Sequence, residues 1–248
     1  MKKLPFIALV LFLMSVIFSC SNQQNKPQQV AELTENDSID IVKTPYANDP
    51  RKTEYETPVL KTSRLRHGIV KRFYLEGCLY SEIPYKNGQM EGTGYTYYQS
   101  KNGEKPKVWK EQVFVDGKLT GLCKRYHENG KIQAEYEYKE GNLGIGMKEF
   151  TKEGIEIQQP ELVVNSFNSG GQIVIKASLS KPANNVEYFA GSLIDGKFLN
   201  PKAKTLIIND GFAFYGVPSE NTSKQQTISA TFTTGFASKC LISKTINL

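Results

Sequence analysis

The feature that most constrains the fold of this chain is a set of glycine, aromatic and glutamate positions that recur between residues 68 and 157. Gly68, Gly92 and Gly121 begin three successive units, and Ile145, which lies between two glycines, begins a fourth. An insertion around "SKNGEKPK" lengthens the second unit. Self-similarity at such a period indicates a repeat architecture. The other positions that define the repeat are Phe73, Gly77, Glu82, Tyr85, Gly88, Tyr97, Glu111, Phe114, Gly117, Tyr126, Gly130, Glu135, Tyr138, Gly141, Phe150 and Gly154.

Each unit is predicted to contain two strands and two turns. Residues 132–138 of the third unit alternate apolar and polar side chains, which is the period of a strand with one apolar face. "ENGK" at 128–131 and "EGNL" at 140–143 supply turns, because Asn and Gly accept the positive φ that tight hairpins require. One short hairpin cannot bury its own face. We therefore expect the units to join in one long meandering sheet with a row of aromatic residues.

The repeat pattern resembles a known family. The pattern consists, in order, of a glycine, an aromatic residue, "NG", a glutamate, an aromatic residue and a closing glycine. This order is similar to the bacterial variant of the MORN repeat, which occurs in YwqK-type antitoxins. The resemblance covers Gly68 to Ile157, less than half of the chain. It implies a hairpin repeat with phospholipid or protein partners. An antitoxin activity would belong to the cytoplasm and fits poorly with an exported chain.

The aromatic residues of the repeats have two structural interpretations. In the first, they are core or half-core residues of a one-layer sheet, in which cross-strand aromatic pairs stabilise by ~0.5–1 kcal/mol each. In the second, they form a row of exposed platforms on which a glycan or peptide stacks. The candidate binding residues under the second interpretation are Tyr97, Trp109 and Tyr126. We expect the first interpretation to hold for the row as a whole.

The repeated glutamates also have two interpretations. Glu82, Glu111 and Glu135 could form a ladder of carboxylates that binds a cation. We expect instead that they face solvent beside Lys and Arg side chains of neighbouring strands, and we predict no metal site.

The N-terminus has the pattern of a bacterial lipoprotein signal. Two lysines precede an uncharged apolar run, Leu4 to Ser19, that is short for a transmembrane helix. The run ends in "IFSC", which resembles a lipobox, so residues 1–19 are predicted to be the signal peptide and Cys20 the lipidated residue. The resemblance implies a lipid anchor in the cell envelope, in the outer membrane facing the periplasm, with the cell surface as the alternative.

Residues 20–63 are predicted to be a lipidated, largely disordered tether. The segment is rich in Gln, Asn, Asp, Glu, Lys and Pro and shows no sustained period, so it buries too little apolar surface to offset chain entropy. A short strand at "DSIDIV" is the alternative for residues 37–42. The repeats are expected over residues 64–158.

Residues 160–248 are predicted to form a β-sandwich that is immunoglobulin-like in size. The glycine period stops, and runs of alternating apolar and polar residues follow, such as 172–180 and 227–235. Asn209-Asp210-Gly211 lies between two apolar runs and indicates a hairpin. The fold class is therefore all-β throughout.

Little in the sequence points to catalysis or to a cofactor. Cys78, Cys123 and Cys240 are an odd number of thiols for an exported protein, and Cys123 and Cys240 take apolar positions of their strands. His127 follows Tyr126 at a position that Tyr74 and Tyr98 occupy in other units, and His67 lies outside the first unit. We expect His127 to be a substituted aromatic residue rather than a base or ligand.

Charge and composition narrow the function further. The net charge is +6, and without Lys2 and Lys3 of the signal it is +4, with no Lys/Arg stripe for nucleic acid. We expect a non-catalytic envelope lipoprotein whose repeat sheet binds a protein or peptide partner. Binding of cell wall or glycan by exposed aromatics is the alternative. An antitoxin or immunity-type protein and a hydrolase in the C-terminal region are less favoured.

Overall fold

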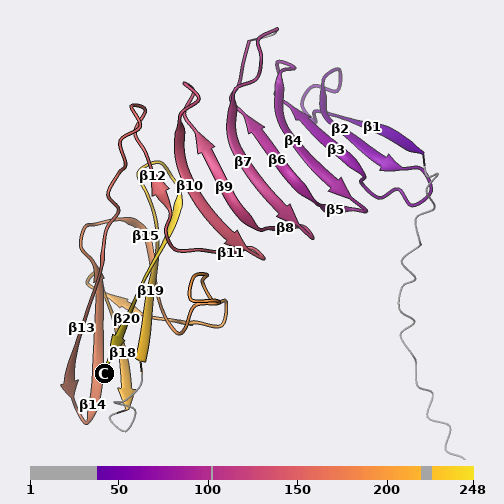
Figure 1. Cartoon of the computed structure of the whole chain (residues 1–248). Coiled ribbons are helices and arrows are strands. Elements are labelled where there is room, and N and C mark those ends of the chain that lie inside the picture. The colour runs from indigo at the N-terminus through magenta and orange to yellow at the C-terminus, as the bar shows by residue number, and fades with distance from the viewer. Residues whose placement is uncertain (1–37, 102, 219–224) are drawn as a thin grey trace, which may run out of the picture. The chain divides into compact units, whose positions relative to one another are not determined.

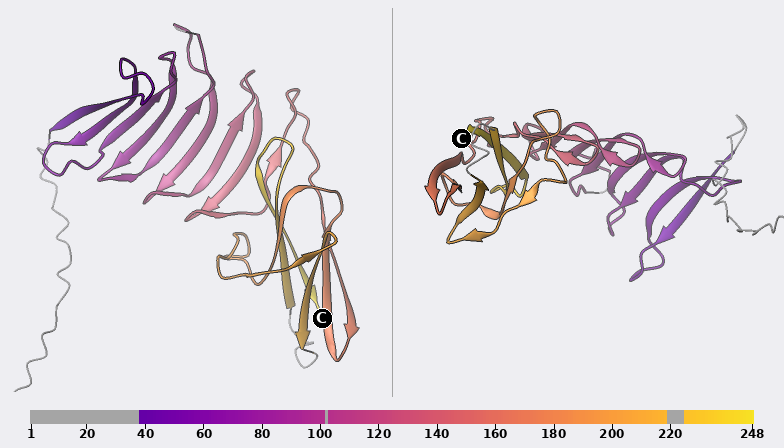
Figure 2. Two further views of the ribbon diagram at one scale, coloured as in Figure 1. Left: turned by 180° about the vertical axis from the view of Figure 1, so that it is seen from behind. Right: turned by 90° about the horizontal axis from the view of Figure 1, so that it is seen from below.

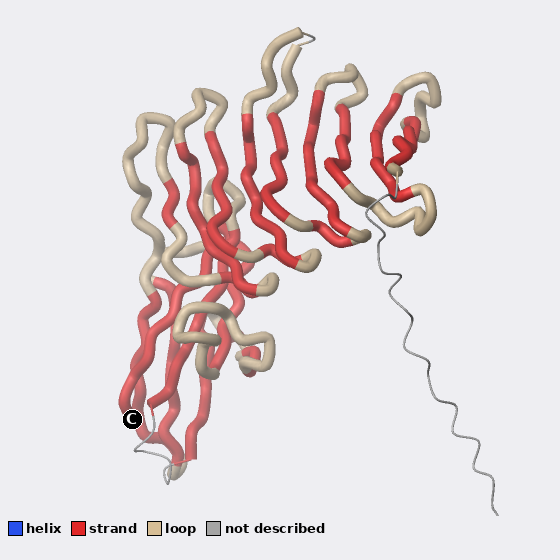
Figure 3. Tube along the Cα trace, turned by 45° about the vertical axis from the view of Figure 1, so that its right-hand side comes forward, coloured by secondary structure: helices blue, strands red, loops and turns tan. Residues whose placement is uncertain are grey.

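The computed structural model describes residues 38–101, 103–218 and 225–248. In this part of the chain every regular element is a β-strand, and no helix occurs (Figure 3). The described residues accordingly include no helix long and apolar enough to cross a membrane. The prediction of an all-β chain is confirmed. The signal peptide and Cys20 lie outside the described residues.

The N-terminal part is a 12-stranded antiparallel sheet, the repeat sheet, in the order β1-β2-β3-β4-β6-β7-β9-β10-β11. Its strands lie side by side in one layer and follow the order of the chain (Figures 1 and 2). Three short strands lie off this path, where β5 pairs with β4, β8 with β7 and β12 with β10. The bounds are β1 (Ile39–Pro45), β2 (Thr53–Leu60), β3 (Gly68–Phe73), β4 (Leu79–Lys86), β5 (Gln89–Met90), β6 (Gly92–Tyr97), β7 (Val108–Val115), β8 (Lys118–Leu119), β9 (Gly121–Tyr126), β10 (Ile132–Lys139), β11 (Asn142–Leu143) and β12 (Lys148–Glu149).

The turns that close the repeats, after β4, β7 and β10, share one backbone conformation. Asn87 and Gly88 have φ of 51° and 89° between paired strands β4 and β5, and Glu140 and Gly141 have 50° and 83° between β10 and β11. Two successive residues with positive φ make the two-residue turn whose twist matches that of the flanking strands. The prediction of tight hairpins at these glycines is confirmed.

The expected tether is wrong for residues 39–60. β1 and β2 pair with each other over their whole length, and β2 pairs with β3 through Tyr55 and Glu56. Val59 and Leu60 at the end of β2 are buried. The polar composition hid this hairpin, because its strands are stabilised by pairing with the first repeat rather than by an apolar face of their own. The alternative of a strand at "DSIDIV" agrees with β1, which begins at Ile39.

A β-bulge recurs at one position of each hairpin. The pairing shifts by one residue between Arg72 and Phe73, between Thr96 and Tyr97, and between Ile132 and Ala134. A bulge leaves one residue without a partner and re-aims its side chain. The residues in this position are Glu54, Tyr80, Trp109 and Gln133.

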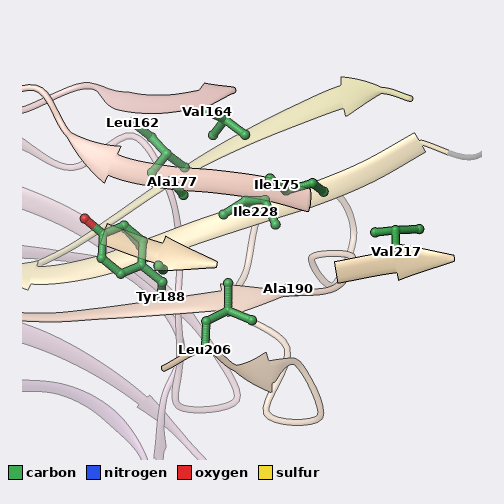
Figure 4. Close-up of a cluster of buried hydrophobic side chains, with 11 residues drawn as sticks. Leu162, Val164, Ile175, Ala177, Tyr188, Ala190, Leu206, Val217 and Ile228 are labelled. Atoms are coloured by element: carbon green, nitrogen blue, oxygen red, sulfur yellow. The ribbon is translucent and has the colours of Figure 1, made fainter. Parts of the chain in front are cut away.

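The C-terminal domain consists of two four-stranded antiparallel sheets, in the orders β13-β14-β18-β17 and β16-β15-β19-β20. Their inner faces share a buried apolar core that includes Ile175 and Ala177 of one sheet and Tyr188 and Ile228 of the other (Figure 4). This agrees with the predicted sandwich. The bounds are β13 (Leu162–Ser169), β14 (Gln172–Leu179), β15 (Asn184–Ala190), β16 (Lys204–Thr205), β17 (Ile208–Asn209), β18 (Phe212–Pro218), β19 (Gln225–Thr233) and β20 (Lys239–Asn247).

The last repeat packs against the C-terminal domain. Glu149 of β12 is almost completely buried and accepts a hydrogen bond of 2.7 Å from the Thr234 hydroxyl. Beside it, Met147 forms a small buried cluster with Phe232 and Cys240 of the sandwich. Repeat arrays need a cap on their terminal unit, because that unit otherwise exposes an unpaired apolar face. The C-terminal domain supplies such a cap.

Candidate functional site

The two faces of the repeat sheet carry different side chains. On one of them, the register of the strands creates a row of charged residues that runs across the sheet. Antiparallel pairing places one residue of each strand opposite the next, and the signs alternate except at Tyr95. The row is Lys43, Glu56, Lys71, Glu82, Tyr95, Glu111, Lys124, Glu135 and Lys148. We call this side of the sheet the ladder face.

The ladder face is close to electrically neutral. Lys43 Nζ lies 3.0 Å from Glu56 Oε1, and Lys71 Nζ lies 3.7 Å from Glu82 Oε1. Opposite charges on directly paired residues stabilise a sheet by ~0.2–1 kcal/mol per pair. The expectation that the repeated glutamates lie beside basic side chains is confirmed. Among the described residues, no group of three His, Cys, Asp or Glu side chains is placed to hold a metal ion.

Two of the predicted binding residues take part in bonds within the ladder face. Tyr97 is 9% exposed, and its hydroxyl donates a bond of 2.7 Å to Glu82 Oε2. The half-buried Tyr126 donates one of 2.8 Å to Glu111 Oε2. Burial, and then the bond to Glu111, raise the pKa of Tyr126 to about 12. These phenols join successive repeats and are not free platforms, so the interpretation as half-core residues holds for Tyr97 and Tyr126.

A second set of side chains links each repeat to the next through the main chain. The Tyr74 hydroxyl donates to the Tyr97 carbonyl at 2.9 Å, and the Tyr98 hydroxyl donates to the Tyr126 carbonyl at 2.7 Å. The Tyr46 hydroxyl makes the same bond to the Phe73 carbonyl. Tyr46 therefore belongs to an additional repeat formed by β1 and β2, which lies N-terminal to the four predicted from the sequence.

His127 takes the place of these tyrosines in the third repeat. Its Nε2 lies 2.8 Å from the Phe150 carbonyl oxygen, so Nε2 carries the proton and donates. Nδ1 is then the acceptor for Gln133 Nε2 at 3.3 Å. The prediction that His127 substitutes for an aromatic residue is confirmed. His67 instead lies 3.1 Å from the Asn87 amide oxygen at an exposed position.

The opposite side of the sheet, which we call the aromatic face, gathers rings and cations. The bulge turns Tyr80 toward this side, where the Arg72 guanidinium lies 5.0 Å from its ring centroid and 5.3 Å from that of Tyr55. Trp109 lies beside Tyr98, with ring centroids 6.0 Å apart. Cations over aromatic faces are attracted by the ring quadrupole, by ~0.5–1 kcal/mol at exposed sites.

Trp109 is thus separated from the other two predicted binding residues. Side chains alternate between faces along a strand, and Arg125, which contacts the Trp109 ring at 5.8 Å, precedes Tyr126 in β9. Tyr97 and Tyr126 bond to the ladder face, whereas Trp109 lies on the aromatic face. The three residues do not form one site.

The cations of the aromatic face differ in their partners. Arg72 Nη2 lies 2.8 Å from Glu54 Oε1, a salt bridge between the first two hairpins. Lys110 Nζ lies 4.0 Å from the centroid of Trp109, and within the described residues neither Lys110 nor Arg125 has a carboxylate at salt-bridge distance. Burial and the charge of Arg125 lower the pKa of Lys110. Positive charge is therefore uncompensated at Lys110 and Arg125.

The ladder face also has an exposed aliphatic row beside its charges. Ile41, Ile69 and Leu122 are 57%, 52% and 47% exposed. Pairing places them in one line with Pro58, Pro84 and Val113 across the sheet. Pro58 is buried and Pro84 and Val113 are half-buried, so the accessible part of the row consists of Ile41, Ile69 and Leu122.

The thiols of the described residues are buried. Cys78, Cys123 and Cys240 are free and buried. Burial, with Glu149 nearby, raises the pKa of Cys240 to about 12, and burial also raises the pKa of Cys123. The thiolate is the nucleophile, so the raised pKa keeps the thiols of Cys123 and Cys240 in the unreactive protonated form at neutral pH. The predicted apolar environment of Cys123 and Cys240 is confirmed.

Sequence reasoning missed Tyr46, the β-bulges and the Lys110–Arg125 pair. Tyr46 has the same position in its hairpin as Tyr74 and Tyr98, which is a signal that the sequence carries N-terminal to residue 64. The pair carried no local signal, because its residues are 15 positions apart and meet only through the pairing of Lys110 with Arg125.

Comparisons with known proteins agree with this geometry. A family model described as a MORN repeat variant matches residues 66–87 and 119–140. These segments hold the β3–β4 and β9–β10 hairpins. No curated protein and no solved structure gave a significant match. The chain therefore carries MORN-variant repeats, and the structure adds a corresponding hairpin, β6–β7, in which the insertion lengthens the connection.

Proposed function

We propose that this protein is a non-catalytic lipoprotein of the bacterial cell envelope whose repeat sheet is an interaction scaffold for a protein or peptide. The observation that carries the proposal is the aromatic face. Its half-exposed rings and cations lie on one side of the repeat sheet, and Lys110 and Arg125 lack carboxylate partners within the described chain.

The composition of this face suits protein recognition. Tyrosine, tryptophan and arginine are enriched at the energetically dominant positions of protein interfaces, since they give large contact areas at low entropic cost. Here Tyr98 and Trp109 form a ring pair, and Arg72 lies between two tyrosines. The excess of positive charge favours a partner segment with acidic side chains.

The fold itself supports a scaffold rather than a catalyst. The bonds of Tyr74, Tyr98 and His127 hold each repeat at a fixed spacing from the next, which gives a rigid surface. MORN repeats generally mediate interactions with proteins or membranes, which is compatible with this role. The half-exposed Tyr98–Trp109 pair also favours a second candidate, in which a sugar ring of a cell-wall glycan stacks on this face.

Site-specific photo-crosslinking in the intact envelope tests the proposal. A photoreactive amino acid replaces Gln112, which lies beside Lys110 on the aromatic face, or Thr93, which lies on the ladder face. We expect a discrete protein adduct from position 112 and a weaker one, or none, from position 93. Adducts only from position 93, or none from either, would refute binding at the aromatic face. A glycan adduct from position 112 would favour the second candidate.

Lipid attachment is tested separately. Radiolabelled palmitate is expected to enter the wild-type chain and not Cys20→Ala, and membrane fractionation should place the labelled chain in the outer membrane. Label in the Cys20→Ala variant would contradict the proposed anchor.

A further inference from the structure

We infer that Lys110, Arg125 and Lys239 form a binding site for a small oxyanion, a carboxylate or a phosphate group, between the aromatic face and the β19–β20 turn. A cavity of about 110 Å³ lies there. It is lined mainly by the three cations together with Tyr136, Tyr138 and Ser238, and no carboxylate lines it. The volume holds several water molecules, and hence a group of a few heavy atoms.

Arg125 lines this cavity and has an unused hydrogen-bonding edge. Its Nη1 donates to the Phe236 carbonyl at 2.8 Å and to Ser238 Oγ at 2.9 Å, which fixes the guanidinium plane. Its Nε is buried and has no hydrogen-bond partner, and Nη2 has no acceptor among the described residues. The Nε–Nη2 edge of arginine matches the two oxygens of a carboxylate or phosphate. An orphaned buried donor on a charged group indicates an acceptor supplied from outside the chain.

Lys110 brings a second positive charge to the same place. It is paired with Arg125 across β7 and β9, and its Nζ lies over the Trp109 ring at 4.0 Å. Two cations on directly opposed residues repel each other unless an anion lies between them. The pKa of Lys110 is lowered by burial and by Arg125, which agrees with a missing counter-charge.

The remaining groups complete the cation cluster with neutral donors. Lys239 contributes a third charge, although its Nζ also lies 3.8 Å from Glu187 Oε2 in an exposed pair. Burial raises the pKa of Tyr136 to about 12 and that of Tyr138 in the same direction, so both phenols keep their protons. Their hydroxyls have no acceptor among the described residues, and they can donate to an anion. This inference uses the same two cations as the proposed function, but it requires only a small anion and so can hold whether or not a protein partner binds.

Fluorescence of Trp109 tests the site directly, because Trp109 is the single tryptophan of the chain and contacts both Lys110 and Arg125. The full-length protein is titrated with sodium phosphate and with sodium acetate, against sodium chloride at equal ionic strength. The melting temperature is measured in the same solutions, since a ligand that binds only the folded state raises it. We expect a saturable response in at least one of the two readouts with phosphate, acetate or both.

Two matched lysine variants give the control. Lys110→Gln should weaken the binding at least tenfold. Lys124→Gln makes the same change of charge on the ladder face and should bind as the wild type does. A response to phosphate alone identifies a phosphoryl site, and a response to acetate alone identifies a carboxylate site. The inference is overturned if neither phosphate nor acetate gives a larger response than chloride in either readout, or if the two variants bind equally well.

Discussion

The bond between Tyr126 and Glu111 gives the sharpest test of how neighbouring repeats stabilise each other. The Tyr126 hydroxyl donates to Glu111 Oε2 at 2.8 Å, from β9 to β7. A hydrogen bond to a charged group contributes about 1.5–3 kcal/mol when buried. Both side chains are half-buried, so Tyr126→Phe should lower the free energy of unfolding by a value at the lower end, about 1.5 kcal/mol.

Urea unfolding of the full-length chain, followed by Trp109 fluorescence, measures this loss. If the free energy of unfolding falls by about 3 kcal/mol per M urea, the midpoint of unfolding should fall by about 0.5 M. A double-mutant cycle with Glu111→Gln isolates the pair, and we expect a coupling energy of about 1 kcal/mol. Trp109 is two residues from Glu111, so the signal reports on the repeats concerned.

Tyr95→Phe is the matched control. Tyr95 lies on the same face, next to Glu111 in the charge row, but its hydroxyl has no hydrogen-bond partner among the described residues. Removal of the Tyr95 hydroxyl should change the free energy of unfolding by less than about 0.5 kcal/mol. Equal losses in Tyr95→Phe and Tyr126→Phe, or a coupling energy near zero, would show that the bond adds nothing to packing.

Three further predictions follow from the same geometry. The pKa of Tyr126 is about 12 in the folded state and ~10 in the unfolded state, so its contribution to the free energy of unfolding is complete below pH 10 and declines as pH rises from 10 to 12. The free energy of unfolding of Tyr126→Phe should therefore decline less than that of the wild type over this range. Identical pH profiles of the two proteins would contradict this. Gly92→Ala should lower the free energy of unfolding by about 1–2 kcal/mol. The reason is that Gly92 has φ of 104° and an added Cβ would lie 3.3 Å from Pro84 Cγ. An unchanged denaturation midpoint would show that this strain is absent. The thiol of Cys240 should resist a thiol reagent at pH 8 in the native chain and react in denaturant, and stoichiometric native labelling would show that the site opens.

Some parts of this fold could be predicted because their causes are local. The turn at Glu140-Gly141 needs two positive φ angles, and the residues that accept them are visible in the sequence. The alternation of Ile228 and Ala230 with polar residues predicted the apolar face of β19, and both are fully buried, although Ser229 and Thr231 on the other face are buried as well. The phase of His127 among the repeats predicted its role as a substituted aromatic residue, which the bond to Phe150 bears out.

The errors arose where a stabilising partner is distant in sequence. Residues 39–60 look too polar to fold, and they form strands because β3 offers a paired edge. The candidate residues Tyr97, Trp109 and Tyr126 share a composition but not a face. A bulge at Trp109 changes the direction of its side chain, and no local pattern marks a bulge.

The sequence by itself determined the repeat, the positions of its turns and the strand character of both domains, because φ preferences and side-chain alternation act over a few residues. Only the tertiary structure decided how those strands align. The register set the charges of the ladder face opposite each other, and the packing of the β19–β20 turn on β9 left the Arg125 edge without a partner. Pairing between strands is a long-range interaction, and a shift of one residue would exchange the two faces.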